Sequence, residues 1–206
     1  AWIALLKETV ELFGGSVDTG EIFTKLYQKS LEGEADCGGV MVYNYLAGEG
    51  VTHLDEGCAM VVRDASANLT LANFMRAQLF STMTTLRLGM DLLQEEHVAI
   101  DSLTGHGGLF KTPLVGQKFL AAACNAPVTC MEAAGEGGPY GMALLCAYLT
   151  EKQAGQALED FLNERVFREN RGVTVAPDAA DAAGFLNYTE RFASGLAAER
   201  MATETL

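Results

Sequence analysis

The amino-acid sequence predicts an α/β fold, and three observations support this prediction. The chain has 206 residues, of which 49% are hydrophobic, so it can build one substantial domain. Residues 71–93 carry apolar side chains at a helical spacing over about six turns, which indicates a long amphipathic helix. Beyond this helix, short strand-like segments alternate with helical ones, as is typical of α/β folds.

The first part of the chain predicts two more helices and two short strands. One helix covers about 2–13 and ends at Gly14-Gly15. Residues 18–21 (Asp-Thr-Gly-Glu) resemble a capping box, so a second helix begins there. Its apolar face consists of Ile22, Phe23, Leu26, Tyr27 and Leu31. Residues 40–45 and 59–63 are read as strands.

The second part predicts strands and helices in alternation. The strands are 98–103 and 127–131, and the helices that follow them are 112–124 and 139–151, the latter with Pro139 at its permissive first position. A helical tail over about 153–206 then contains helices at 153–167 and 185–200, separated by a surface loop at 172–183.

Two glycine-rich turns are the main candidates for a binding site. The turn 105–108 follows the first of these strands, and the turn 135–138 follows the second. Their spacing of ~30 residues is the length of one βαβ unit. If the strands are parallel neighbours, both turns meet at the carboxyl edge of one sheet, where open α/β sheets bind ligands. Each turn also leads into a helix N-terminus, which favours anions, so a phosphorylated or nucleotide ligand is expected.

Several nearby side chains have two interpretations. Lys111 either meets a phosphate or ribose or is a solvated lysine at a helix start. Glu136 either binds a ribose hydroxyl or, as we expect, complements the dipole of its own helix. His106 is interpreted as a turn residue that tolerates an unusual backbone rather than as a catalyst. The turns themselves can also be simple tight turns, and neither matches a Walker or dinucleotide fingerprint.

A late group of arginines also has two interpretations. Arg165, Arg168 and Arg171 either reach a ligand or acidic neighbours or, as we expect, form a solvated helix face.

Composition excludes several classes of protein. The net charge of −13 argues against a nucleic-acid binder, which needs a basic face. No apolar run approaches the ~20 residues that span a bilayer, and no signal peptide is evident, so we expect a cytoplasmic protein without membrane association. The three histidines are dispersed, which argues against a metal site. The five cysteines are interpreted as buried free thiols.

The order of these motifs resembles the carboxyl-terminal domain of the FGGY carbohydrate kinases. Residues 103–108 (Leu-Thr-Gly-His-Gly-Gly) resemble the adenosine loop of that family, and 136–144 (Glu-Gly-Gly-Pro-Tyr-Gly-Met-Ala-Leu) its following glycine turn. Residues 45–49 (Tyr-Leu-Ala-Gly-Glu) resemble its Tyr-Leu-x-Gly-Glu loop. Asn73-Phe74-x-x-Ala77 partly matches its second signature. The agreement covers about 1–150, and the helical tail also suits the family.

The resemblance implies a ribonuclease-H-like, actin-type ATPase lobe with a mixed sheet flanked by helices, forming a single domain over 1–206. In the family, two such lobes close over Mg-ATP and a sugar, and phosphate passes to a sugar hydroxyl. The xylulokinase and ribulokinase branches are the most similar, which implies a ketopentose. The nucleotide-binding residues carried over are Gly105, His106, Gly107, Gly108, Lys111, Gly137 and Gly138.

The chain also departs from the family pattern. The first loop is longer than usual, Gly50 stands where many members carry Arg, and Arg63 lies near a position that is often glycine. The catalytic aspartate and the phosphate-binding loops of the family belong to segments that precede this chain. Its first residues also begin mid-pattern, so we expect a fragment of a longer kinase that is inactive alone, with ATP and Mg²⁺ bound in the intact enzyme. We therefore assign no catalytic residue.

Two other readings of the sequence stay open. One is a non-catalytic, actin-like domain for nucleotide sensing or protein interaction. The other is an unrelated α/β enzyme with Cys124 or Cys130 as nucleophile, which would need a thiol of depressed pKa. The sugar, the phosphorylated hydroxyl and the oligomeric state, with a homodimer among the options, are not specified by the sequence.

Overall fold

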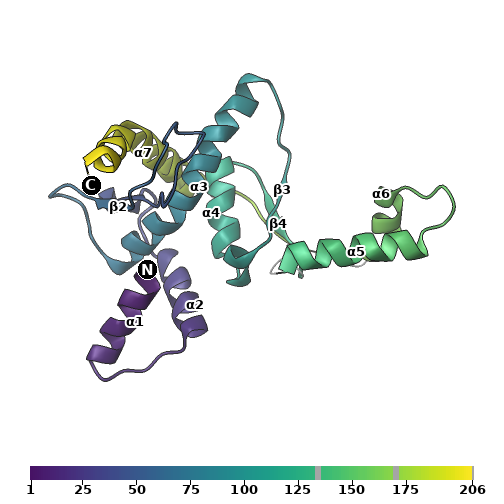
Figure 1. Cartoon of the computed structure of the whole chain (residues 1–206), viewed down its shortest axis with the longest axis horizontal. Coiled ribbons are helices and arrows are strands. Elements are labelled where there is room, and N and C mark those ends of the chain that lie inside the picture. Colours follow the sequence, from purple (N-terminus) through teal and green to yellow (C-terminus); the bar gives the residue numbers. More distant parts are fainter. Residues whose placement is uncertain (133–135, 169–171, 206) are drawn as a thin grey trace.

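The computed structural model describes residues 1–132, 136–168 and 172–205 (Figure 1). The helices are α1 (Trp2–Leu12), α2 (Thr19–Ser30), α3 (Leu71–Glu95), α4 (Val115–Cys124), α5 (Gly137–Glu151), α6 (Leu158–Phe161) and α7 (Ala179–Thr205). The structure also describes short 3₁₀ turns η1 (Cys37–Gly39) and η2 (Gly108–Lys111) and a π-helical turn η4 (Leu162–Val166). The strands are β1 (Met41–Tyr43), β2 (Met60–Val62), β3 (Leu103–Thr104), β4 (Val128–Cys130) and β5 (Val173–Val175).

The core forms where α3, α4 and α7 pack together beside β1. Phe80 of α3 lies edge-on to Phe119 of α4, with ring centroids 5.2 Å apart, and it also packs against Phe185 of α7. The Tyr188 hydroxyl of α7 accepts from the Val42 amide and donates to a carbonyl of α3. Large buried aromatic rings contribute much of a domain's hydrophobic stabilisation. The carboxyl-terminal helix is therefore part of the core.

The strands form two small sheets. β1 and β2 are antiparallel, whereas β3 pairs with β4 in parallel and β4 pairs with β5 antiparallel. The register places Leu103 opposite Val128. Because α4 provides the crossover between β3 and β4, the predicted βαβ unit and the predicted common edge are both confirmed.

A buried arginine of α3 makes polar and cation–π contacts with the neighbouring elements. The Arg76 side chain is only 3% exposed and forms an ion pair with Asp181 of α7. Its Nη1 donates to the Gly33 carbonyl at 3.1 Å. Its guanidinium carbon lies 4.9 Å from the ring centroid of Phe80 and 5.0 Å from that of Phe119. One cation thus joins α3, α4, α7 and the turn after α2, and the rings add cation–π attraction.

The strand predicted at 98–103 is wrong for most of its length. Only Leu103–Thr104 pairs, as β3. The Val98 amide donates to the Leu93 carbonyl at 2.9 Å, and His97 has a φ of 57°. Val98 therefore helps to close the end of α3, because the last carbonyls of a helix need donors.

The surface loop predicted at 172–183 is also wrong. It contains β5, and α7 begins at Ala179 rather than near 185. The Asp178 side chain accepts from the Ala180 and Asp181 amides at 2.9 and 3.0 Å, which makes it the cap of α7.

Helix starts differ from the predictions in smaller ways. The helix predicted from 112 begins at Val115 because η2 and Leu114, with a φ of 69°, come first. The helix predicted from 139 begins at Gly137. The helix predicted at 153–167 begins only at Leu158 and ends in η4. The predicted cap at Asp18 is confirmed by its bond from the Gly20 amide at 2.7 Å.

The helices α5 and α6 stand away from the rest of the molecule as an arm (Figure 1). Every residue of α5 is described, and no residue of this helix is buried, although the helix is largely apolar. Its exposed apolar side chains include Met142, Leu145 and Leu149. Among the helices described, none is both long enough and apolar enough to cross a membrane.

Candidate nucleotide site

The two glycine-rich turns lie against each other at the carboxyl edge of β3 and β4. The turn 105–108 leaves β3, and Gly137 opens α5 after β4. A Cβ atom on Gly137 would lie 2.6 Å from Nδ1 of His106, so the two turns are in close contact. Gly135, at the start of the second predicted turn, lies outside the described residues. The predicted proximity of the turns is therefore observed for the described part.

Two glycines of the first turn are required for different reasons. Gly107 has a φ of 105° and a ψ of −177°, a conformation that is essentially restricted to glycine. A Cβ atom there would meet nothing within 4 Å, so the requirement comes from the backbone alone. At Gly105, in contrast, a Cβ atom would lie 2.3 Å from the Phe110 ring.

A small hollow opens between the two turns. It is lined by Thr104, Gly105, His106, Met131, Gly137, Tyr140, Gly141, Leu144 and Phe167, and its volume is about 200 Å³. This volume is below the roughly 300–1,000 Å³ of pockets for drug-sized ligands. The lining is mainly glycine, aliphatic and aromatic, which suits one flat apolar ring better than a whole charged nucleotide.

Lys111 and Glu136 join the two turns at their surface. Lys111 Nζ lies 2.7 Å from a carboxylate oxygen of Glu136, and both side chains are more than half exposed. The hydrogen bond and charge of Lys111 lower the pKa of Glu136 below its ordinary value. Glu136 is the residue before α5, where a negative charge also favours the helix dipole. Lys111 thus has a protein partner, and its predicted contact with a ligand stays a prediction.

The predictions for His106 and for the arginines of the helical tail have different outcomes. His106 does not belong to the residues with positive φ, so the predicted unusual backbone is wrong there, and its ring packs against Gly137 instead. Arg165 pairs with an acidic neighbour, Glu151, at 2.9 Å, so the alternative interpretation applies to it, although both side chains are more than half exposed. Arg171 lies outside the described residues.

Six of the lining residues were absent from the predicted site: Thr104, Met131, Tyr140, Gly141, Leu144 and Phe167. Tyr140 and Leu144 lie one helical turn apart on α5, in step with Gly137 and Gly141, and this i, i+4 spacing is the signal that could have found them. Phe167 reaches the hollow from beyond η4. No local pattern indicates that contact, because it depends on how the arm folds back.

The Tyr-Leu-Ala-Gly-Glu segment forms part of the connection between β1 and β2. Glu49 pairs with Leu54 across a short bridge, and a Cβ atom on Gly48 would lie 2.3 Å from a backbone oxygen. The buried Glu199 of α7 accepts from the Cys58 amide at 2.7 Å. The carboxyl-terminal helix therefore holds this loop in place.

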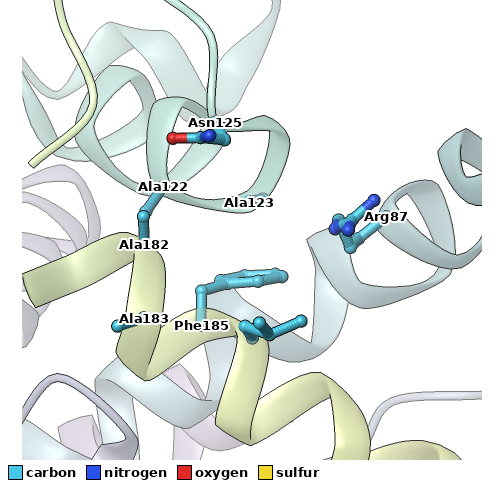
Figure 2. A pocket seen from close by; sticks show the side chains of 8 residues that line it. Arg87, Ala122, Ala123, Asn125, Ala182, Ala183 and Phe185 are labelled. Carbon is cyan, nitrogen blue, oxygen red and sulfur yellow. The ribbon is translucent and has the colours of Figure 1, made fainter. Parts of the chain in front are cut away.

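A different pair of hollows adjoins Arg87 of α3. Figure 2 shows one of them, with Arg87, Asn125 and Phe185 around it. The other is lined in part by Cys124. Neither hollow contains a residue of the glycine turns. Burial raises the pKa of Cys124 to about 11 and also raises that of Cys130, which argues against either thiol as a nucleophile.

The sequence implies two ligands, ATP and Mg²⁺, and the described residues suit the first better than the second. The apolar hollow and its glycine walls fit a nucleobase. For a divalent cation, the described residues contain no group of three or more His, Cys, Asp or Glu side chains placed to hold a metal. Mg²⁺ ligands would thus have to come mainly from the nucleotide and from outside this set of residues.

A family model matches most of the chain. Residues 2–150 match the family model described as the FGGY family of carbohydrate kinases, C-terminal domain. No curated protein sequence matches the chain.

Solved kinases share the fold at low sequence identity. A xylulose kinase from Rhodospirillum rubrum is 18% identical with a TM-score of 0.66, and the match covers 96% of this chain and 36% of that one. A gluconate kinase from Lactobacillus acidophilus is 16% identical with a TM-score of 0.64, covering 84% and 34%. Plasmodium falciparum glycerol kinase with ADP is 13% identical with a TM-score of 0.61, covering 85% and 33%. The chain therefore spans about a third of the length of these kinases.

Proposed function

The chain belongs to the FGGY family of carbohydrate kinases and has their α/β, ribonuclease-H-like fold, and on that premise we propose that it is the ATP-binding lobe of a sugar kinase. The observation that carries this proposal is the apolar hollow between the two glycine turns. We propose that residues 1–206 form one domain, since α7 completes the core.

The hollow would take the adenine base, and the turns would take the polar part of the nucleotide. Gly107 lets the chain approach a ligand without a side chain in the way. No described side chain caps α5, so the amides of Gly137 and Gly138 are available to an anion at the positive end of the helix. Lys111 would add a positive charge beside them, within reach of a phosphate or a ribose.

Catalysis would need groups beyond this lobe. Phosphoryl transfer depends on a base, a metal and phosphate donors held together, and Mg²⁺ neutralises charge on the transferring phosphate when it is bound. We propose that an amino-terminal lobe supplies the base and the phosphate loops, and that this lobe alone is inactive. Xylulose kinases recur among the similar structures, which supports a ketopentose such as xylulose or ribulose as substrate. We propose that the intact enzyme acts in the cytoplasm.

A pair of substitutions on α5 tests the placement of the base. Gly141 lines the hollow, and a Cβ atom there meets nothing within 4 Å, whereas Ala143 is exposed and does not line the hollow. Gly141→Leu should fill the hollow and weaken ADP binding about tenfold or more by calorimetric titration. Ala143→Leu should keep affinity within about threefold.

The position of the binding site and the kinase reaction are tested by different outcomes. Equal ADP affinity in the chain and in Gly141→Leu would contradict the placement of the base. Phosphorylation of xylulose or ribulose by the lobe joined to its amino-terminal domain, measured by ADP release, would support the kinase. Nucleotide binding without ADP release from any sugar tested would favour the non-catalytic alternative.

A further inference from the structure

The hollow shown in Figure 2 lies among α3, the end of α4 and the start of α7. Its volume is about 240 Å³, below that of pockets for drug-sized ligands, so it has room for a single ring or a short chain. Ala122, Ala123 and Phe185 form its floor, since each is no more than 3% exposed. Leu186 is 48% exposed and lies at its rim. The hollow therefore has a buried, apolar floor.

One wall of the hollow carries a positive charge. Among the described residues that line it, only Arg87 is charged, and the Arg87 side chain is just 23% exposed. Its Nη1 donates to Asp91, one turn further along α3, and Asp91 does not line the hollow. A guanidinium has five N–H donors in a planar fork, so Arg87 keeps donors for a second partner. A largely covered arginine beside an open space favours an anionic group there.

The rest of the lining defines what carries that anionic group. Apart from Arg87 and Asn125, the lining consists of alanine, phenylalanine and leucine side chains. A sugar would place its hydroxyls against groups that neither donate nor accept hydrogen bonds, which is unfavourable. A phosphate monoester carries a charge of roughly −1.5 to −2 at neutral pH, more than one cation that already has a carboxylate partner can balance. A carboxylate has a single charge and matches a guanidinium with two parallel bonds.

We propose that this hollow binds a small monocarboxylate whose carboxylate is attached to an apolar ring or chain. Arg87 would hold the carboxylate, Asn125 would donate a further bond from its amide, and the apolar part would lie on Phe185 and the alanines. The hollow shares no residue with the glycine turns, so the proposal does not depend on the function assigned to those turns. Because α3, α4 and α7 meet only in the folded chain, the ligand should also raise the melting temperature.

Titration of the ¹⁵N-labelled chain with benzoate, phenylacetate and hexanoate tests the proposal. At least one acid should give saturable shifts in the amide signals of Ala123, Asn125 and Ala183. The neutral amide of that acid has the same shape without the charge, and it should bind about tenfold more weakly or less. Arg87→Gln should weaken binding of the acid about tenfold or more. Arg200→Gln, which removes an exposed positive charge outside the hollow, should keep affinity within about threefold.

A second pair of variants tests the apolar part of the site and keeps the test decisive if Arg87→Gln disturbs the fold. Ala183 and Ala193 are both exposed alanines of α7, but only Ala183 lines the hollow. Ala183→Leu should fill the hollow and weaken binding about tenfold or more, whereas Ala193→Leu should keep affinity within about threefold. No saturable shift with any of the three acids would overturn the proposal. Equal affinity for the acid and its amide, or equal affinity in the parent chain and in Ala183→Leu, would overturn it as well.

Discussion

At the scale of single residues, Gly107 and Gly108 differ in backbone conformation but not in the space around them. Both positions would accept a Cβ atom without contact, but only Gly107 has a positive φ. We expect Gly107→Ala to lower the free energy of unfolding by about 1–3 kcal/mol and to weaken ADP binding. Gly108→Ala should leave the free energy of unfolding unchanged. Urea unfolding and calorimetric titration measure both effects, and equal behaviour of the two variants would contradict this explanation.

The glycines of the first turn were predicted because a side chain there would block close approach of the backbone to a ligand, and that role stays a prediction. The structure adds a second reason for Gly107, whose backbone conformation is essentially restricted to glycine. Lys111 and Glu136 were assigned separate roles, yet they pair with each other. Their pairing depends on the side-by-side arrangement of two turns, and charge alone in the sequence does not specify a partner.

At the scale of elements, the ion pair between Arg76 and Asp181 should be the main polar link between α3 and α7. Asp181→Asn leaves the buried guanidinium without its countercharge, so we expect a loss of about 3 kcal/mol in unfolding free energy. Glu151→Gln, which breaks the exposed pair with Arg165, should cost less than about 1 kcal/mol. Chemical denaturation of the two variants compares them, and similar losses would show that burial does not matter here.

Long elements were predicted more accurately than short ones. The helix α3 was predicted almost to its ends because its apolar period repeats over many turns. The strands have only two or three residues each, too few for an alternating pattern to be distinct, and β5 was missed for that reason. The end of α3 was placed too early, because its closing turn uses Val98, a residue of high strand propensity.

At the scale of the whole molecule, buried thiols should make the fold sensitive to alkali. Burial raises the pKa of Cys124 from an ordinary value near 9 to about 11, and it also raises that of Cys37. Because the unfolded chain loses these protons first, the stability present below pH 9 should decrease as the pH rises from about 9 to 11.

We expect the melting temperature to fall by roughly 2–5 °C over this interval. Cys124→Ala should reduce the fall, whereas Cys146→Ala, at an exposed position, should not. Calorimetric melts at pH 8 and pH 10.5 measure the difference. A fall that is identical in Cys124→Ala and in the parent chain would assign the alkaline loss to other groups.

The overall architecture could be predicted from the alternation of strands and helices and from the family motifs. The burial of the carboxyl-terminal helix in the core could not be predicted, because the contacts of Phe185, Tyr188 and Phe192 join residues far apart in the sequence. Such contacts leave no periodic signal in a single chain. The family motifs also end near residue 150, before these aromatic residues begin.

The position of Tyr188 in the core has a consequence for how the protein is made on the ribosome. Its hydroxyl bonds to Val42, a residue synthesised 146 positions earlier. The partners α3 and α4 therefore leave the exit tunnel with the aromatic faces that α7 will cover still open to water. At about 5–20 residues per second, several seconds pass before α7 arrives. During that interval the nascent chain presents an apolar surface that chaperones bind, and nonsense mutations before α7 should yield aggregates rather than a smaller folded domain.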